Sequence, residues 1–317
     1  MRVVELTRFG GPEVLVPGEA PAPAAGDGQV VVDVAAAGIT FVETQIRRGV
    51  DKWHDVPEPP YVPGGVVAGT VREVGVGVDE AWIGRRVLAD TGVTGGFAEM
   101  AAADVQTLIP VPDGLELTAA VALHTDGTTA LGLVEGAGIT PGERVLVEAA
   151  GGGVGSLLVQ LARARGAHVV GAARGQRKLD LVRTLGADEV VDYSTEDWTS
   201  ALAPVDVVFD GVGGEIGRAA FGLVARGGRF SVHGAASDAV TEIDPAEAAR
   251  RGVEVLGIEQ LFGFGEHAKE WAERVLAEAV AGRIRPVIGQ SFPLERAADA
   301  HAAIESRTSV GKTLLLP

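Results

Sequence analysis

The sequence predicts an α/β protein in which a β-rich domain accompanies a doubly wound parallel sheet, and three observations support this fold class. A glycine-rich turn near residue 150 joins an apolar run to a helix-like run. Apolar runs alternate with helical patterns from about residue 120 onward. Before that point, short strand-like runs follow one another. The chain has 317 residues, which is long enough for two domains.

Short runs in the first 120 residues predict an antiparallel β region. Pro and Gly turns separate the runs. The candidate strands are VVELTRF, QVVVDVAAAGI, VVAGTVREVG, RRVLAD and FAEMAAADV. After the first of them lies PGEAPAPAAGDGQ, whose turn-forming residues predict an exposed loop and not an interdomain linker.

Apolar runs that alternate with helical patterns predict a parallel sheet in the second part of the chain. A helical stretch begins near Leu117 and leads into these units. The candidate buried strands are RVLVEA, HVVGAA, DEVVDY, DVVFDGV, GGRFSVHG and VEVLGI. Six strands with intervening helices match a complete doubly wound sheet of the Rossmann type. A long amphipathic helix around EHAKEWAERVLAEAVAGRI follows, and the tail returns to strand, helix and strand.

A glycine-rich turn joins the strand RVLVEA to the helical run SLLVQLARARG. Its residues are Ala150, Gly151, Gly152, Gly153, Val154 and Gly155, which form a G-x-G-x-x-G pattern with alanine at the first glycine position. In this pattern Gly152 lets the backbone approach a pyrophosphate, and Gly155 lets the helix pack closely on the strand. The free N–H groups at the start of the helix would then face the phosphates. The alternative is a glycine-rich loop that only turns a corner between strand and helix.

The charges that follow the next strand predict which cofactor binds. An NAD-binding protein places an Asp or Glu about twenty residues beyond the glycine turn, on the ribose 2′-hydroxyl. Here the strand HVVGAA ends at Ala173 and is followed by Arg174, Arg177 and Lys178. Basic side chains attract a 2′-phosphate, and Arg174 can bind it through two hydrogen bonds. We therefore expect NADPH, with solvated charges at the start of a helix as the alternative.

Composition agrees with a soluble enzyme. The chain has 27 basic and 43 acidic residues and a net charge of −16, which opposes general nucleic-acid binding. It has no cysteine, which excludes disulfides and thiolate chemistry. No apolar run reaches membrane-spanning length, and MRVVELTRFGG lacks the basic and apolar regions of a signal peptide. We therefore expect a cytoplasmic protein.

The order of several motifs resembles the medium-chain dehydrogenase/reductase superfamily, and within it the zinc-free NADPH:quinone oxidoreductase branch. The motifs are AAGGGVGSLLVQLARARGA, LGADEVVDY, DVVFDGVGG, GGRFSVHG and IRPVIGQSFPLERAADAHAAIESRTSVGKTLLLP. The resemblance implies a GroES-like catalytic domain over residues 1–120 and 263–317 and an NADP-binding Rossmann domain over residues 121–262. It also implies an active site in the cleft between the domains, a small-molecule electron acceptor and a homodimer.

The zinc ligands of related enzymes are replaced in this chain. Thr40 stands near the usual cysteine, and Gly65 and Val66 stand where a His-Glu pair would be. The side chains of Gly65 and Val66 cannot bind a metal, so zinc chemistry on alcohols is not expected. The chemistry that remains is hydride transfer to a quinone, a conjugated enone or a 2-alkenal, whose oxygen takes up the developing negative charge.

The resemblance also implies which residues lie near the substrate. Relatives often place an Asn and a Tyr where this chain has Thr40 and Gln45, both of which can donate hydrogen bonds. Tyr61 and His54 lie in DKWHDVPEPPYVPG, a loop that borders the cleft in this family. An enoyl-thioester reductase and a non-enzymatic NADPH-binding protein stay open as alternatives, and the altered Thr40 and Gln45 slightly favour the second.

Further cofactor contacts are carried over from the family, position by position. Tyr193 and Lys178 match residues beside the 2′-phosphate. Gly213 follows a strand whose end passes near the adenosine and the nicotinamide ribose in the family, and His233 and Gly234 end the next strand, close to where the nicotinamide should lie. Thr129 could face the nicotinamide or a phosphate, and Lys312 in VGKTLLLP could return to the cofactor, with a solvated strand end as its alternative.

Overall fold

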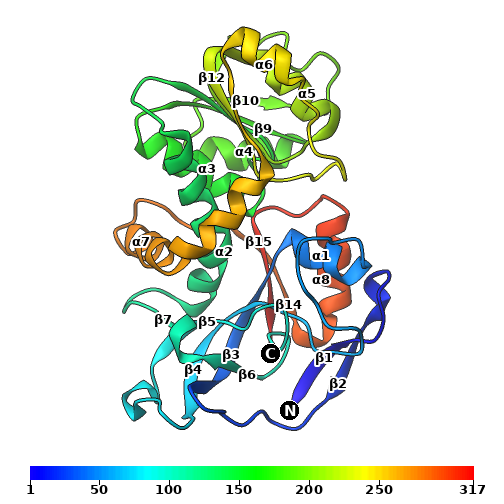
Figure 1. The fold of residues 1–317 in the computed structure, drawn as a ribbon, viewed down its shortest axis with the longest axis vertical. Helices are drawn as coiled ribbons and strands as arrows, with labels where there is room; N and C mark the ends of the chain where they lie inside the picture. Colours follow the sequence, from blue (N-terminus) through cyan, green and yellow to red (C-terminus); the bar gives the residue numbers. More distant parts are fainter. The chain divides into compact units, whose positions relative to one another are not determined.

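The computed structural model describes all residues, Met1–Pro317, which form two compact units. Unit 1 comprises Met1–Thr125, Ala272–Val280 and Pro286–Pro317. Unit 2 comprises Asp126–Trp271 and Ala281–Arg285. Their elements are labelled in Figure 1. None of the helices has the length and apolar character needed to cross a membrane.

Unit 1 is built on a seven-stranded sheet in the order β14-β15-β3-β4-β5-β7, with β6 also paired to β3. The strands are β3 (Gln29–Ile39), β4 (Val66–Val74), β5 (Arg86–Asp90), β6 (Met100–Asp104), β7 (Ile109–Pro110), β14 (Ile288–Pro293) and β15 (Lys312–Leu316). All neighbours are antiparallel except β14 and β15. The predicted antiparallel β region is therefore confirmed.

A separate ribbon of two antiparallel strands, β1 (Arg2–Leu6) and β2 (Leu15–Glu19), precedes the sheet. Pro17–Glu19, the first three residues of the predicted exposed loop, are exposed as expected, but the loop assignment is wrong for them because they belong to β2. Val4 pairs with Pro17 and Val3 with Gly18. This ribbon has no third strand, so β2 is an edge strand, where a proline is tolerated.

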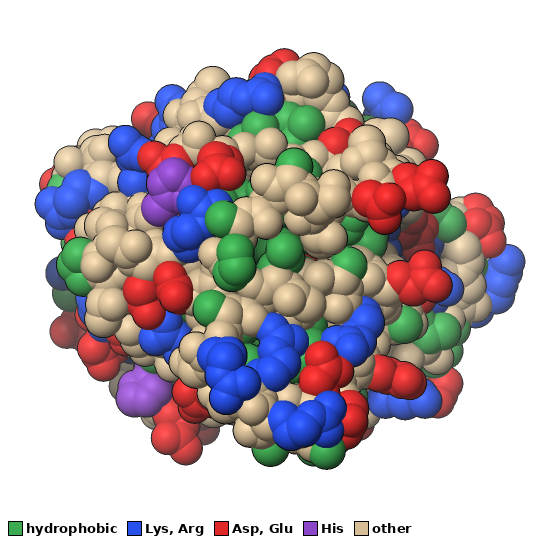
Figure 2. All heavy atoms as spheres, turned by 90° about the horizontal axis from the view of Figure 1, so that it is seen from above, with side chains coloured by type: hydrophobic (Ala, Val, Ile, Leu, Met, Phe, Trp, Pro, Cys, Tyr) green, Lys and Arg blue, Asp and Glu red, His purple; other side chains and the backbone are tan.

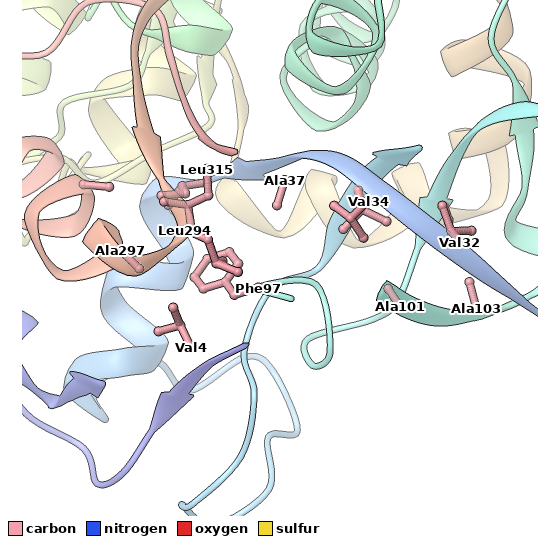
Figure 3. Close-up of a cluster of buried hydrophobic side chains, with 14 of the residues drawn as sticks. Val4, Val32, Val34, Ala37, Phe97, Ala101, Ala103, Leu294, Ala297 and Leu315 are labelled. Carbon is pink, nitrogen blue, oxygen red and sulfur yellow. The ribbon is translucent and has the colours of Figure 1, made fainter. Parts of the chain in front are cut away.

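The core of unit 1 lies where side chains of the sheet meet the ribbon and helix α8 (Ala297–Glu305) (Figure 3). The burial of β3 follows from its sequence, because its apolar residues leave few polar positions along the strand. Val32, Phe97 and Leu315 are completely buried in this core. Each such side chain contributes roughly 1.5–3 kcal/mol by leaving water. Helix α1 (Phe41–Arg48) lies against α8.

Unit 2 contains a six-stranded parallel sheet in the order β10-β9-β8-β11-β12-β13. Its strands are β8 (Arg144–Val147), β9 (His168–Ala173), β10 (Glu189–Asp192), β11 (Val205–Asp210), β12 (Val224–Val232) and β13 (Glu254–Leu256). The chain runs outward from β8 in one direction and from β11 in the other. The predicted doubly wound sheet is confirmed, with its switch point between β8 and β11.

Helices connect these strands and extend the chain beyond them (Figure 1). They are α2 (Leu117–Ala137), α3 (Gly153–Ala164), α4 (Gln176–Thr184), α5 (Gly214–Leu223), α6 (Pro245–Arg251) and α7 (Ala268–Val280). The amphipathic helix expected around EHAKEWAERVLAEAVAGRI begins at Ala268, after a stretch of 3-10 helix, Ile258–His267. Acidic and basic side chains both occur across the face of the molecule shown in Figure 2.

Candidate functional site

The glycine turn of unit 2 has the close packing that its sequence pattern requires. Gly152 is the N-cap of α3, and its backbone N–H donates to the carbonyl of Ala149 at 2.8 Å. A Cβ on Gly155 would overlap the same carbonyl oxygen, and a Cβ on Gly153 would overlap the carboxylate of Asp126. Only glycine therefore lets strand and helix approach in this way. The turn forms a cradle of backbone groups that fits a pyrophosphate at the start of a helix.

Ala150 and Val154 complete this turn. Ala150 is buried, and its N–H donates to the carbonyl of Ala172 on β9 at 3.0 Å. Val154 is half-buried in the first turn of α3. Thr129 lies half-buried on α2, one turn beyond Asp126.

The basic residues predicted to bind a 2′-phosphate come from neighbouring elements. Ala173 at the end of β9 pairs with Asp192 at the end of the parallel strand β10. Arg174 and Tyr193, the next residues in the two strands' sequences, therefore leave neighbouring strands at the same edge of the sheet. Arg174 is exposed, whereas Tyr193 is half-buried against the core of unit 2. Lys178 lies in the first turn of α4, and its side chain passes 3.0 Å from where a Cβ on Gly151 would stand.

An acidic residue lies beside this group. The carboxylate of Asp192 accepts hydrogen bonds from the backbone N–H of Gly175 and Ser194, each at 2.9 Å. Burial raises the pKa of Asp192, but hydrogen bonds from Ser194 and Gly175 and the nearby charge of Arg174 outweigh it and lower the pKa overall. The carboxylate therefore orders the turn that leads from Arg174 into α4.

The turn after β11 is held by Asp210, which sequence reasoning did not single out. Its carboxylate accepts from the N–H of Val212 at 3.0 Å, the N–H of Gly213 at 2.7 Å and the hydroxyl of Thr241 at 2.5 Å. Gly213 has φ of 77°, and a Cβ there would overlap the carbonyl of Ala239. Gly213 is therefore fixed in a conformation that favours glycine.

His233 and Gly234 follow β12 directly. The N–H of His233 donates to the carbonyl of Asp210 at 2.8 Å, and its Nδ1 is buried without a hydrogen-bond partner. Burial lowers the pKa of His233 to about 4, although Asp210 acts in the opposite direction. His233 is therefore neutral at neutral pH. A Cβ on Gly234 would stand 2.7 Å from the carbonyl oxygen of Gly211, so β11 and β12 end in close contact.

In unit 1, Thr40 forms the N-cap of α1 through a capping box with Glu43. Glu43 Oε2 accepts from the N–H of Thr40 at 2.6 Å and from its hydroxyl at 2.9 Å, and Oε1 accepts from the N–H of Gly65 at 3.2 Å. Burial raises the pKa of Glu43, although these hydrogen bonds and the charge of Lys312 act in the opposite direction. The hydroxyl proton of Thr40 is thus directed to Glu43.

Lys312 is 4% exposed, which excludes the alternative of a solvated strand end. Its side chain passes 3.2 Å from where a Cβ on Gly38 would stand. Its charge also acts on His124: burial, assisted by Lys312, lowers the pKa of His124 to about 4. The buried side chain of Lys312 therefore acts on the carboxyl group of Glu43 and on the neutral imidazole of His124.

Gln45 and Tyr61 occupy different surroundings within unit 1. The side-chain amide of Gln45 donates to the hydroxyl of Thr44 at 3.2 Å. The Tyr61 hydroxyl is buried without a partner, and burial, with the charge of Glu43, raises its pKa. Tyr61 lines a cavity of about 10 Å³ together with Glu43, Arg47 and His301.

The residues present do not fit a zinc site. The chain contains no group of three or more His, Cys, Asp or Glu side chains placed to hold a metal ion. The hydroxyl of Thr40 is bonded to Glu43, and Gly65 contributes only its backbone N–H there.

Known proteins share both the sequence and the fold of this chain. A family model for the alcohol dehydrogenase GroES-like domain matches residues 26–113, and one described as zinc-binding dehydrogenase matches residues 185–315. The quinone oxidoreductase of Rattus norvegicus is 34% identical over 100% of this chain and 98% of the relative. The chain belongs to the zinc-free quinone oxidoreductase branch of the medium-chain dehydrogenase/reductase superfamily. This confirms the resemblance read from the motif order.

Other members of this superfamily extend the comparison. The quinone oxidoreductase of Escherichia coli, solved in complex with NADPH, superimposes with a TM-score of 0.90 at 28% identity over 100% of both chains. A mycobacterial protein complexed with NADPH has a TM-score of 0.89 and 31% identity, again over 100% of both chains. The 2-haloacrylate reductase of a Burkholderia species is 32% identical over 97% of this chain and 96% of its own length.

Three acidic residues of this chain that the structure shows to be important were not identified from the sequence. Glu148 and Asp210 each stand at the carboxyl end of an apolar run, where an ionisable residue interrupts a buried strand. That interruption is the signal that could have found them. Glu43 stands three residues after Thr40, which is the spacing of a capping box, but its contact with Gly65 depends on the fold.

Proposed function

We propose that the chain is an NADPH-dependent, zinc-independent oxidoreductase that transfers hydride to a quinone, a conjugated enone or a 2-alkenal. The observation that carries this proposal is the glycine cradle of unit 2, followed by Arg174 where an NAD enzyme has an acid. The NADPH-complexed relatives and the full-length similarity to quinone oxidoreductases support it.

Residues of unit 2 would hold the cofactor. Gly152 and the N–H groups of α3 would face the pyrophosphate, and Arg174, Lys178 and Tyr193 would surround the 2′-phosphate. The bound cofactor supplies the hydride from C4 of its nicotinamide. The turn at Gly213, and the strand ends at His233 and Gly234, would shape the region beyond the pyrophosphate.

Residues of unit 1 would polarise the acceptor. Gln45 is the stronger candidate donor, because its amide nitrogen makes one long hydrogen bond, to Thr44, while Arg48 donates to its amide oxygen. Thr40 directs its proton to Glu43, so it would have to exchange that bond in order to donate to the acceptor oxygen. Tyr61 carries a buried hydroxyl without a partner and is the third candidate. A quinone or enone needs only modest polarisation, since its developing charge is delocalised onto oxygen.

The test is oxidation of NADPH by the purified protein with a quinone, a 2-alkenal, a 2-haloacrylate and an enoyl-thioester. Turnover with at least one of the first three acceptors is expected, and the 2-haloacrylate is included because of the Burkholderia relative. Preference for the thioester would favour the enoyl-thioester reductase. Tight NADPH binding without turnover on any acceptor would favour the non-enzymatic binding protein.

We also propose that the protein works as a cytoplasmic homodimer, as the family resemblance implies. Light scattering on the purified protein should give twice the mass of one chain, and cell fractionation should recover it in the cytoplasmic fraction. A monomeric mass across the working concentration range would contradict the first part.

A further inference from the structure

Two buried acidic side chains meet at the switch point of the unit 2 sheet. Glu148 directly follows β8 and Asp210 ends β11, and these strands are parallel neighbours with Val147 paired to Phe209. Both residues are 0% exposed. In doubly wound sheets this crevice, beyond the carboxyl ends of the strands, is where ligands bind.

The two carboxyl groups differ in their hydrogen-bond partners. Asp210 accepts three hydrogen bonds, from Val212, Gly213 and Thr241. Neither carboxyl oxygen of Glu148 has a donor of good geometry, although the group lies within hydrogen-bonding reach of Asp210. Two adjacent buried carboxylates cannot both carry a charge at low cost. We therefore expect one of the two carboxyl groups to be protonated, and a proton on Glu148 would supply its missing hydrogen bond.

The surroundings determine which residue holds that proton. The three donors stabilise Asp210 as a carboxylate, whereas the charged form of Glu148 is favoured only by the N–H of Val212, which also donates to Asp210. Burial, the negative charge of Asp210 and their mutual hydrogen bond together raise the pKa of Glu148 well above its ordinary value. The second oxygen of Glu148 stays a buried acceptor.

Other charged or titratable groups near the pair do not replace this proton. His233, from the end of β12, is neutral because burial lowers its pKa to about 4. At the glycine turn, Lys178 packs on Gly151 and the carboxylate of Asp126 packs on Gly153. Ionisation of Glu148 would therefore add a second negative charge beside the carboxylate of Asp210.

We propose that Glu148 and Asp210 share one buried proton, and that this proton keeps the switch-point crevice receptive to the phosphates of a dinucleotide. Glu148 is then a positioning residue: it donates to Asp210, which in turn fixes the turn at Val212 and Gly213. Loss of the proton would repel the cofactor's phosphates and release Asp210 from one of its four hydrogen bonds. This inference rests on the proposed NADPH binding.

The proton itself can be observed by infrared spectroscopy of the wild-type protein, without any variant. A buried neutral carboxylic acid gives a carbonyl band distinct from that of a carboxylate. We expect this band near pH 7, and we expect Glu148→Gln to remove it. Glu143→Gln is the matched control, because Glu143 is paired with Arg229 and its pKa is lowered, so the band should persist. Absence of the band in the wild type, or its persistence in Glu148→Gln, would overturn the proposal.

The link to the cofactor is measured as the Kd of NADPH from about pH 7 to about pH 10, where the 2′-phosphate, with a second pKa of about 6, is fully ionised. Wild-type Kd should rise by up to about tenfold per pH unit as the band disappears, whereas Kd of Glu148→Gln should follow only the titrations common to both proteins. A band that persists throughout, with equal affinity in both proteins, also supports the shared proton.

Two outcomes separate this inference from the proposed function. If the band disappears with rising pH while both proteins keep identical Kd profiles, the proton does not govern cofactor binding and the inference fails. If neither protein binds NADPH at any pH while the band is present near pH 7, the proposed function fails and the shared proton remains. Asp210→Asn serves as a second variant: it needs no proton from Glu148, so it should shift the band titration to lower pH.

Discussion

At the scale of single residues, the most unusual side chain of unit 1 is a histidine in the core. His301 is 1% exposed, neither ring nitrogen has a hydrogen-bond partner, and its ring meets Phe97 edge-on at 5.9 Å. Burial, with help from the charge of Arg47, lowers its pKa to about 3. The adjoining cavity of about 10 Å³ has room for about one water, which could partner these nitrogens and the Tyr61 hydroxyl.

His301 should make the stability of the protein depend on pH. The unfolded chain binds a proton on this residue below about pH 6.5, and the folded protein does so only near pH 3. Between these values the unfolded state binds more protons, so the free energy of unfolding falls as pH falls, by up to about 1.4 kcal/mol per pH unit from this group. The free energy of unfolding, measured with urea at several pH values, should depend less steeply on pH in His301→Leu than in wild type. Exposed His54→Leu is the control, and equal slopes for wild type and His301→Leu would contradict the prediction.

Arg174 should determine the preference between the two nicotinamide cofactors. A charge-assisted hydrogen bond to the 2′-phosphate contributes roughly 1.5–3 kcal/mol, so wild type should bind NADPH at least about tenfold more tightly than NADH. Arg174→Ala should narrow this gap and leave the Kd of NADH nearly unchanged. Arg226→Ala is a control on an exposed arginine of β12. Equal Kd values for the two cofactors in wild type would refute the assignment of Arg174.

At the scale of elements, the start of α1 combines two roles in one residue: Thr40 caps the helix and is also a candidate hydrogen-bond donor to the substrate. Thr40 caps the helix, while Glu43 of the same box reaches Gly65 before β4. One carboxylate therefore holds both the helix start and the end of a loop. The position where related enzymes bind zinc is here a hydrogen-bonded corner.

Substitutions at Thr40 should separate these two roles. Thr40→Val removes the cap and should lower the free energy of unfolding by about 0.5–2 kcal/mol. Thr40→Ser keeps the cap and the hydroxyl and should match wild type in both stability and turnover. If the Thr40 hydroxyl donates to the acceptor, folded Thr40→Val should have a lower kcat than wild type. The measurement is kcat with a quinone at a temperature where the variant is folded, so that unfolding does not account for the loss. Full kcat in the folded variant would leave Gln45 and Tyr61 as the candidates.

How far the sequence predicts each element depends on where the information lies. The strands of unit 2 were predictable because burial on both faces leaves continuous apolar runs, as in β8 and β9. Strand β2 was missed because Pro17 and Gly18 look like turn residues, and only pairing with β1 makes them a strand. The roles of Glu43 and Lys312 depend on distant neighbours, Gly65 and Gly38, which local patterns do not reveal. The glycine turn was predictable because its function depends on adjacent residues.

At the scale of the whole molecule, the absence of metal ligands gives a further test. The chain has no cysteine and no suitable group of His, Asp and Glu, although one matching family model is described as zinc-binding. NADPH-dependent turnover and Tm should therefore be unchanged after dialysis against a chelator. Elemental analysis checks the same point, and one zinc per chain that is lost together with activity would contradict it.

The strand order of unit 1 has a consequence for how the protein is made. β15 lies between β14 and β3 in the sheet, yet β3 is among the first strands synthesised and β15 is the last. All of unit 2 is translated between them. Until β15 has been translated, one side of β3 therefore stays partly unpaired. All strands of the parallel sheet of unit 2 have been synthesised before that point. A nascent chain of this protein should thus acquire protease resistance in its middle before its beginning, and a stalled chain lacking the final strand would present an open sheet edge to chaperones.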